Sequence, residues 1–354
     1  MEKTVSYQDQ VNRENVQKLR EVLKTLPPFA KDYFRAIEPT TSTRTRISYA
    51  YDIRIFFQFI LSENPSFKNK TAADLTVDVL DKMQAVDIEE YQEYLKLYNN
   101  DDKTLTNGER GLKRKMSALR SFYAYYYKRE MIKTNPTLLV DMPKLHDKAI
   151  VRLDADETAE LLDYIEHCGD QLTGQKKVYY EKTKLRDLAI VTLLLGTGIR
   201  VSECVGLDVN DVDFKNGGIR VVRKGGSEMM VYFGEEVEKA LLDYLEVRSS
   251  ITPVAGHENA LFYSSQRKRI GVKAVENMVK KYAREITTTK KITPHKLRST
   301  FGTSLYKETG DIYLVADVLG HKDVNTTRKH YAAMDEDRRR RAASAVKLRE
   351  HTDT

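Results

Sequence analysis

Three short runs of residues with the alternation of β-strands interrupt a sequence that otherwise has the periodicity of helices. The runs cover residues 209–214, 218–223 and 228–233, and the glycine-rich turns NGG and KGGS separate them. Short turns of this kind join antiparallel strands. Elsewhere the apolar residues recur at helical spacing. The sequence therefore predicts a mainly α-helical protein that contains one small antiparallel β-sheet.

A polar, proline-containing segment, DMPKLHDKAIVR at residues 141–152, predicts the boundary between two domains. The part ahead of it has only helical patterns and is basic, and the part behind it carries the predicted strands. A chain of 354 residues is long enough for two domains with cores of their own. We place the helical N-terminal domain at residues 1–144, the linker at 145–153 and the second domain at 154–354.

The excess of basic residues points to a polyanionic partner. Lys and Arg number 59 against 52 Asp and Glu, a net charge of +7, although many basic proteins never bind nucleic acid. No apolar run is long enough for a membrane span, and the polar N-terminus does not match a signal peptide. Cys168 and Cys204 fit no metal site, and Cys204 with His321 and His330 matches no known ligand pattern. We expect reduced thiols in the cytoplasm.

Six residues in the second domain have the types that phosphodiester transfer without a metal requires. They are Arg200, Lys224, His295, Arg298, His321 and Tyr331, in the strings GTGIRVSE, VVRKGGSE, PHKLRSTFGT and LGHKDVNTTRKHY. Cationic and proton-donating groups stabilise the charge on a phosphate, and a phenol can act as the nucleophile. No single string is decisive, and the prediction rests on the combination.

The string TPHKLR predicts a helix start that presents two of these groups. Thr293 suits the cap, and Pro294 suits the first helical position. His295 and Arg298 are three residues apart, so they share a helix face. A guanidinium donates two parallel hydrogen bonds to phosphate oxygens, and an imidazole transfers protons near neutral pH. His321 follows the pair LG, which predicts a helix end.

The remaining candidates lie at predicted turns and on the last helix. Arg200 follows the turn GTG and is expected near a helix N-terminus, where backbone N–H groups favour an anion, with Glu203 bracing the turn. Lys224 lies between the second and third predicted strands, where its ammonium can reach a leaving oxygen. Arg223 competes for that role, and strand alternation predicts that the two point to opposite faces. Tyr331 needs nearby guanidiniums, because an unaided phenol has a pKa of about 10.

These strings resemble the catalytic motifs of the tyrosine recombinases, and the resemblance covers nearly the whole chain. The second domain is similar to their catalytic domain, and the helical domain, with the string ALRSFYAYYYKREMIKTNP, is similar to their core-binding domain. Within the family the chain is most similar to the Xer recombinases, in the form that works as a single protein. The N-terminal extension with LPPFAKDYF and the lack of an arm-binding domain indicate that form. The string VVRKGGSE has Arg223 where many Xer proteins have glycine.

The resemblance implies a two-domain fold, a helical core-binding domain and an α+β catalytic domain, and a role for each of the six residues. Tyr331 would attack a DNA phosphate and form a 3′-phosphotyrosine link. Arg200 and Arg298 would hold the non-bridging oxygens, and Lys224 would protonate the leaving 5′ oxygen. His295 would accept the proton of the tyrosine, and the second histidine of the set would hydrogen-bond the phosphate. Because the bond energy is kept in the phosphotyrosine, no metal, nucleotide or other cofactor is implied.

By the same resemblance the partner is double-stranded DNA that contains a dif-like site. Four subunits would synapse two such sites as a homotetramer and resolve chromosome dimers during cell division, with help from the septal DNA translocase FtsK. The segment after Tyr331 would dock on a neighbouring subunit. In the N-terminal domain we expect these basic residues to contact DNA: Arg44, Arg46, Lys113, Arg114, Lys115 and Arg120.

Three alternatives remain open at this point. An integrase of a phage or conjugative element would have the same chemistry and another biological role. A type IB topoisomerase would relax DNA without exchanging partners. A catalytically idle DNA-binding protein would keep the fold and lose one or more of Tyr331, Arg200 and Arg298, and this sequence has all three.

Overall fold

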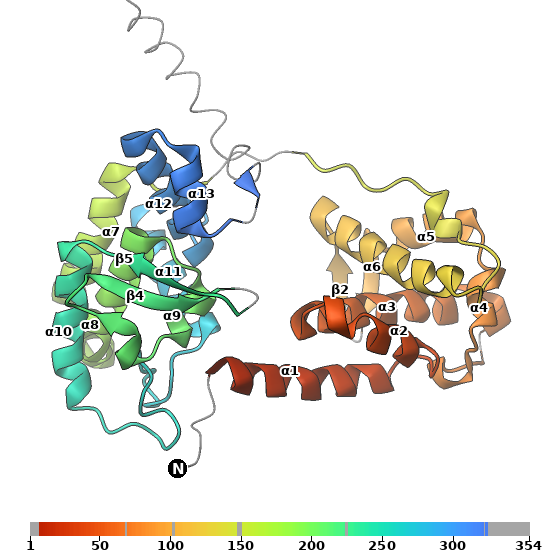
Figure 1. Cartoon of the computed structure of the whole chain (residues 1–354), viewed down its shortest axis with the longest axis horizontal. Helices are drawn as coiled ribbons and strands as arrows, with labels where there is room; N and C mark the ends of the chain where they lie inside the picture. The colour runs from red at the N-terminus through yellow and green to blue at the C-terminus, as the bar shows by residue number, and fades with distance from the viewer. Residues whose placement is uncertain are drawn as a thin grey trace, which may run out of the picture. The chain divides into compact units, whose positions relative to one another are not determined.

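The computed structural model of the chain describes residues 7–67, 69–100, 103–146, 151–223, 226–321 and 323–324. The chain divides into two compact units, residues 1–148 and residues 149–354, coloured red to yellow and green to blue in Figure 1. The division falls inside the segment 145–153 that the sequence predicts to be a linker. Among the described residues, no helix combines the length and apolar character that crossing a membrane requires.

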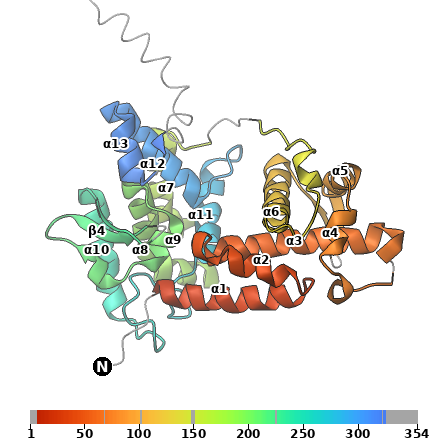
Figure 2. The same cartoon turned by 45° about the vertical axis from the view of Figure 1, so that its right-hand side comes forward.

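The N-terminal unit is built mainly from helices. They are α1 (Tyr7–Lys24), α2 (Ala30–Ala36), α3 (Thr43–Glu63), α4 (Asp78–Lys82), α5 (Ala85–Tyr94) and α6 (Glu109–Lys128). The long α3 packs against both α1 and α6, and Figure 2 shows α1 lying along α3. Ser42 begins α3 as a side-chain cap, since its hydroxyl accepts a hydrogen bond from the Thr45 N–H at 3.3 Å.

Aromatic side chains form much of the core of this unit. Phe122 of α6 packs edge-on against Tyr33 of α2 and Phe57 of α3, with ring centroids 5.1 and 5.9 Å apart. One turn later Tyr126 is buried, and its hydroxyl donates to the Phe29 carbonyl at 2.8 Å. Edge-to-face aromatic packing of this kind adds to the free energy of apolar burial, so α6 is fixed firmly to α2 and α3.

A small hairpin in the N-terminal unit corrects the expectation that this part of the chain contains helices only. Strands β1 (Leu97–Asn100) and β2 (Lys103–Thr106) pair antiparallel. In the sequence only Asp101 and Asp102 separate them, and aspartate favours tight turns. Where the chain leaves α5, the Asn107 side chain donates to the Leu95 carbonyl at 2.7 Å.

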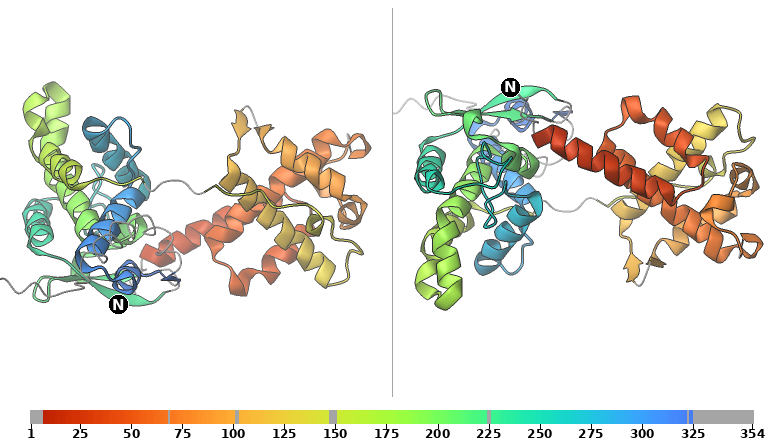
Figure 3. Two further views of the ribbon diagram at one scale, coloured as in Figure 1. Left: turned by 90° about the horizontal axis from the view of Figure 1, so that it is seen from above. Right: turned by 90° about the horizontal axis from the view of Figure 1, so that it is seen from below.

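In the C-terminal unit, helices surround the long α8. The helices are α7 (Ala155–His167), α8 (Gly174–Thr197), α9 (Val201–Gly206), α10 (Glu235–Ser249), α11 (Val272–Ile286), α12 (Pro294–Thr309) and α13 (Ile312–Leu319). The second half of α8 is almost entirely buried, and α7, α10 and α12 pack against this helix, as Figure 3 shows from two sides. Because the C-terminal end of α8 is packed between these helices, the position of the residues that directly follow it is well fixed.

The predicted sheet is present in this unit. Strands β3 (Val212–Asp213), β4 (Gly218–Val222) and β5 (Glu228–Tyr232) pair antiparallel in that order. Side chains of β4 alternate, with Ile219 and Val221 buried and Arg220 exposed. The first strand is shorter than predicted, because residues 209–211 form a 3₁₀ turn. The fold class, mainly α-helical with small antiparallel sheets, is confirmed.

Candidate active site

A left-handed glycine sets the direction of the chain between α8 and the first candidate arginine. Gly198 has φ +62°, and its N–H donates to the Leu194 carbonyl at 3.1 Å, which ends α8. A Cβ at this position would lie 2.3 Å from Phe301 Cδ1 and 3.0 Å from Leu319 Cδ2. Glycine is therefore favoured at position 198 for two reasons: it adopts the positive φ without strain, and its lack of a Cβ lets side chains of α12 and α13 approach closely. Arg200 follows two residues later as the N-cap of α9.

We expect Gly198→Ala to destabilise the C-terminal unit by roughly 2–5 kcal/mol, from about 1–2 kcal/mol of left-handed strain and about 1–3 kcal/mol of overpacking. The measurement is urea unfolding followed by circular dichroism. Gly174→Ala is the matched control, because Gly174 has φ +57° and no atom within 4 Å of its ideal Cβ. Equal losses in the two variants would show that crowding at Gly198 contributes nothing.

Arg200 is held by one carboxylate. Its Nη1 donates to Glu203 Oε1 at 2.8 Å, and its backbone N–H donates to Glu203 Oε2 at 2.7 Å. Glu203 is buried, whereas the Arg200 side chain is about one third exposed at 35%. Nη2 of Arg200 also lies 3.4 Å from the Gly320 carbonyl, as a donor. Glu203 thus braces the turn, as the sequence predicts, and aims the arginine toward the end of α13.

Arg298 reaches the same helix end from α12. The sequence predicts this helix to begin at Pro294 after Thr293, and it does, although Thr293 makes no side-chain cap. Arg298 is buried, with Nη1 donating to the Gly198 carbonyl at 2.5 Å and Nη2 donating to the Leu319 carbonyl. His295 lies one turn earlier and is exposed. The pair therefore shares a helix, but only the arginine enters the packed interior.

Arg223 is the third arginine at this helix end. It directly follows β4 and is buried, as the alternation along that strand indicates when continued by one residue, and it donates through Nη1 to the Leu319 carbonyl at 2.9 Å and through Nη2 to the Val318 carbonyl at 2.8 Å. Its Nη1 lies 3.8 Å from the Glu203 carboxylate. Burial lowers the pKa of Arg223 from its ordinary value, and Glu203 opposes that shift. Carbonyls at a helix C-terminus carry partial negative charge and so favour cations.

The three arginines therefore converge on carbonyls of three consecutive residues, Val318, Leu319 and Gly320. Gly320 ends α13 with φ +60°, and the backbone N–H of His321 donates to the Ala316 carbonyl at 2.9 Å. His321 is thus placed immediately beyond the arginine cluster. The guanidiniums of Arg200 and Arg223 pair with the Glu203 carboxylate, and that of Arg298 donates to main-chain carbonyls. Guanidiniums gathered in this way can complement a phosphate.

The structure brings together three of the six predicted site residues, Arg200, Arg298 and His321, and leaves His295 exposed on the surface of α12. Lys224 and Tyr331 lie outside the described residues. From the sequence, Arg223 is a competitor of Lys224 for the leaving oxygen and is not predicted to join Arg200 and Arg298, although the alternation along β4 could have indicated its burial.

The alternative of a metal site involving Cys204 finds no support from this thiol. Cys204 is fully buried on α9, and burial raises its pKa to about 12. Burial therefore disfavours the thiolate, the form that binds a metal. His330 lies outside the described residues. Within the described ranges, no three His, Cys, Asp or Glu residues form a group that could hold a metal ion.

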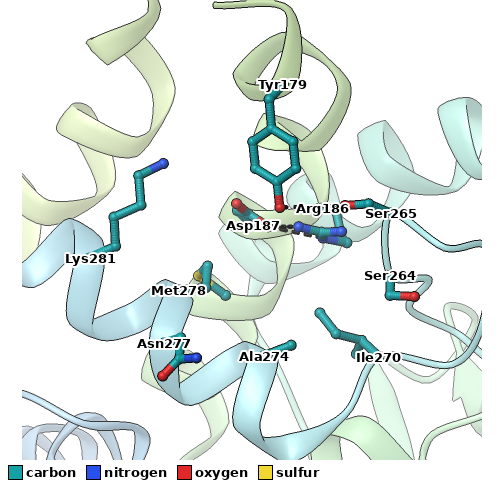
Figure 4. A pocket seen from close by; sticks show the side chains of 10 residues that line it. All are labelled: Tyr179, Arg186, Asp187, Ser264, Ser265, Ile270, Ala274, Asn277, Met278 and Lys281. Carbon is teal, nitrogen blue, oxygen red and sulfur yellow. Dashed lines mark hydrogen bonds and ion pairs between the residues drawn. The ribbon is translucent and has the colours of Figure 1, made fainter. Parts of the chain in front are cut away.

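A separate cavity of about 300 Å³ lies in the C-terminal unit and shares no residue with the arginine cluster. Figure 4 shows Arg186 and Asp187 side by side in its wall. They form an ion pair at 2.6 Å, Arg186 also donates to the Tyr263 carbonyl at 3.0 Å, and the Tyr282 hydroxyl donates to Asp187 at 3.0 Å. The buried charges of this cavity thus have partners within the fold, and we assign it no function.

Three of the basic residues expected to contact DNA differ in exposure. Arg44 is exposed on α3, and Lys113 is partly exposed on α6. Arg46, two residues beyond Arg44, is buried and forms an ion pair with Glu38 at 3.0 Å. DNA contact by these residues stays a prediction, and the accessible Arg44 and Lys113 fit it better than Arg46 does.

The other three such residues lie on α6 and have partners within the unit. Arg114 is half exposed and pairs with the buried Asp52, and the buried Lys115 lies 3.7 Å from the same carboxylate. Burial raises the pKa of Asp52, and the two cations oppose that shift. Arg120 donates to two backbone carbonyls of the segment 137–140, at 3.0 and 2.5 Å. Their predicted contact with DNA is untested, and these bonds provide each of them with a structural role.

Fold and site together define the class of this protein. A mainly helical chain of two units, whose second unit gathers three guanidiniums at the end of α13 next to His321, has donors of the kind that bind a phosphate. The chain matches the phage integrase family over residues 151–338. It belongs to this family, the tyrosine recombinases, which cut and rejoin DNA.

Xer recombinases are among the proteins that this chain resembles in sequence. The tyrosine recombinase XerC of Caldanaerobacter subterraneus subsp. tengcongensis is 33% identical over 332 residues, which cover 90% of this chain and 86% of the relative. The tyrosine recombinase XerS of Streptococcus uberis is 30% identical over 338 residues, covering 88% and 93%. The prediction of an Xer-type tyrosine recombinase is confirmed. The finer assignment to the single-protein form, XerS, stays a prediction.

The solved structures agree on the fold. A XerH site-specific recombinase bound to a palindromic difH substrate superposes with a TM-score of 0.62, at 21% identity, over 86% of this chain and 80% of that chain. At that identity the likeness concerns the fold. The likeness extends to both units.

Proposed function

We propose that this recombinase acts on double-stranded DNA at a dif-like site and resolves chromosome dimers during cell division. The observation that carries the proposal is the 30–33% identity to Xer recombinases along nearly the whole chain. A homotetramer on two synapsed sites, help from the septal translocase FtsK, and action in the cytoplasm belong to this proposal.

In the proposed reaction Tyr331 attacks the scissile phosphorus, so that a bond to the phenol oxygen forms as the bond to the 5′ oxygen breaks. His295 accepts the proton of the phenol, and Lys224 donates one to the leaving oxygen. Arg200 and Arg298 hold the non-bridging oxygens, and His321 donates a further hydrogen bond. Hydrogen-bond donors that the fold already holds in place can stabilise a transition state without reorganising. The hydrogen bonds of Arg200 and Arg298 to main-chain carbonyls hold their guanidiniums in this way, which supports their proposed role at the phosphate.

A nicked duplex with a dif-like sequence tests the chemistry. Cleavage next to the nick releases a short oligonucleotide, so religation is prevented and the covalent intermediate accumulates. We expect the wild-type protein to form a protein–DNA band that survives denaturation in the presence of a metal chelator. DNA binding without that band would contradict the recombinase proposal and favour the idle DNA-binding alternative.

A plasmid with two dif-like sites in direct repeat tests the biological role. Two separate circles are expected if the protein resolves dimers. Relaxation without circles would favour a topoisomerase. Recombination that requires the end sequences of a mobile element would favour an integrase, the alternative consistent with the name of the family.

A further inference from the structure

We propose that Arg223 is a positioning residue that sets the spacing between Arg200 and Arg298. This role rests on the proposed function, because it concerns the two arginines assigned there to the phosphate. Arg223 itself is buried and is not assigned any contact with DNA. It acts through one hydrogen-bond acceptor that it shares with Arg298 and one ion-pair partner that it shares with Arg200.

The first shared acceptor is the carbonyl of Leu319. Arg223 Nη1 donates to it at 2.9 Å, and Arg298 Nη2 donates to the same oxygen. A carbonyl oxygen has two lone pairs, so it can serve both donors at once. A movement of the C-terminal end of α13 would therefore shift the guanidiniums of both Arg223 and Arg298. The bond from Arg223 Nη2 to the Val318 carbonyl, at 2.8 Å, fixes that end a second time.

The second shared partner is the carboxylate of Glu203, which accepts hydrogen bonds from Arg200 and forms an ion pair with Arg223. It accepts from Arg200 Nη1 through Oε1 at 2.8 Å, and Arg223 Nη1 lies 3.8 Å from Oε2. Glu203 is buried, so the attraction between these charges is weakly screened. Arg223 thus links the anchor of Arg200 to the anchor of Arg298, two arginines that come from different helices.

Close packing keeps the Arg223 guanidinium in this place. A Cβ at Gly320 would lie 2.8 Å from Arg223 Cζ, so only glycine leaves room for it. The backbone of Arg223 is fixed as well, because its N–H donates to the Ser227 carbonyl at 2.8 Å and its carbonyl accepts from the Gly226 N–H at 3.0 Å. The hairpin of β4 and β5 therefore holds the residue that joins the two phosphate-binding arginines.

The test compares Arg223→Met with Arg220→Met on the nicked substrate. Arg220 lies on β4, three residues before Arg223, is exposed and pairs with Asp211 at 2.8 Å, so the control removes the same charge from the same hairpin. We expect Arg223→Met to slow single-turnover cleavage at saturating DNA roughly 10–100-fold, somewhat less than loss of a direct donor, with Kd changed less than about 3-fold. Arg220→Met should cleave at the wild-type rate.

A scissile methylphosphonate separates positioning from a general loss of structure. This substrate replaces one charged non-bridging oxygen with a methyl group, so the spacing of the two guanidiniums matters less. On the methylphosphonate substrate we expect the ratio of the wild-type rate to the Arg223→Met rate to be at least about 5-fold smaller than on the normal phosphate. The reason is that Arg200 and Arg298 then have less negative charge to stabilise in the transition state. An equal deficit on both substrates would overturn the proposal, as would cleavage by Arg223→Met at the rate of Arg220→Met.

Arg223→Lys keeps the test decisive if the methionine variant does not fold, as monitored by thermal unfolding. A lysine retains the charge and can donate to one of the carbonyls, but it lacks the planar fork of a guanidinium. We expect an intermediate rate that again depends on the phosphate charge, and a wild-type rate would contradict the proposal. A wild-type protein that forms no adduct would instead mean that the proposed function had failed, whatever the Arg223 variants do.

Discussion

Tyr331→Phe is expected to abolish the covalent protein–DNA adduct while leaving DNA affinity within about 3-fold of wild type. The change removes one oxygen atom, and with it the only nucleophile that the proposed reaction uses. Loss of such a group lowers the rate by roughly 10⁴-fold or more, and other catalytic residues cannot compensate for it. The measurement is adduct formation on the nicked duplex, with affinity determined separately by gel shift.

The matched control is Tyr313→Phe, because Tyr313 is 70% exposed on α13 and belongs to no proposed role. The control should form adduct at the wild-type rate. If Tyr331→Phe still formed adduct, another residue would be the nucleophile. Proteolysis of the adduct and mapping of the modified peptide would identify it.

The strands of the C-terminal unit could be predicted from the sequence, whereas the N-terminal hairpin could not. Along β4 the buried Ile219 and Val221 alternate with exposed side chains, and glycine turns flank the strand. Strands β1 and β2 have four residues each, and in them Tyr98 is the buried hydrophobic residue, with Leu105 half-buried. A hairpin with so little apolar alternation lacks the signal that identifies strands in a sequence.

In the site, residue types were predictable and their acceptors were not. Arg200 and Arg298 stand in recognisable strings, and the three-residue spacing from Arg200 to Glu203 is that of a capping box. The arginines, however, meet main-chain carbonyls at the end of α13. Every residue has a main-chain carbonyl, so the sequence does not indicate which carbonyls will accept hydrogen bonds from the arginines. For this reason Arg223 could be predicted as buried but not as a partner of the other two.

Arg298→Lys is expected to have the second-largest effect, a loss of roughly 10²–10³-fold in the cleavage rate, as for removal of one preorganised donor. Arg298 donates from Nη1 to Gly198 and from Nη2 to Leu319, and this fork fixes its orientation. A lysine keeps the charge but cannot serve both carbonyls and a phosphate in one plane. The loss should fall on the single-turnover rate at saturating DNA, because the charge that Arg298 meets grows in the transition state.

The same substitution is expected to lower the free energy of unfolding by about 1–3 kcal/mol, since a buried carbonyl loses its donor. Cleavage must therefore be measured well below the unfolding temperature of the variant. Arg284→Lys is the control, because Arg284 is exposed in the last turn of α11 and should change neither quantity. If Arg298→Lys lost affinity for DNA in proportion to its cleavage rate, Arg298 would act in ground-state binding.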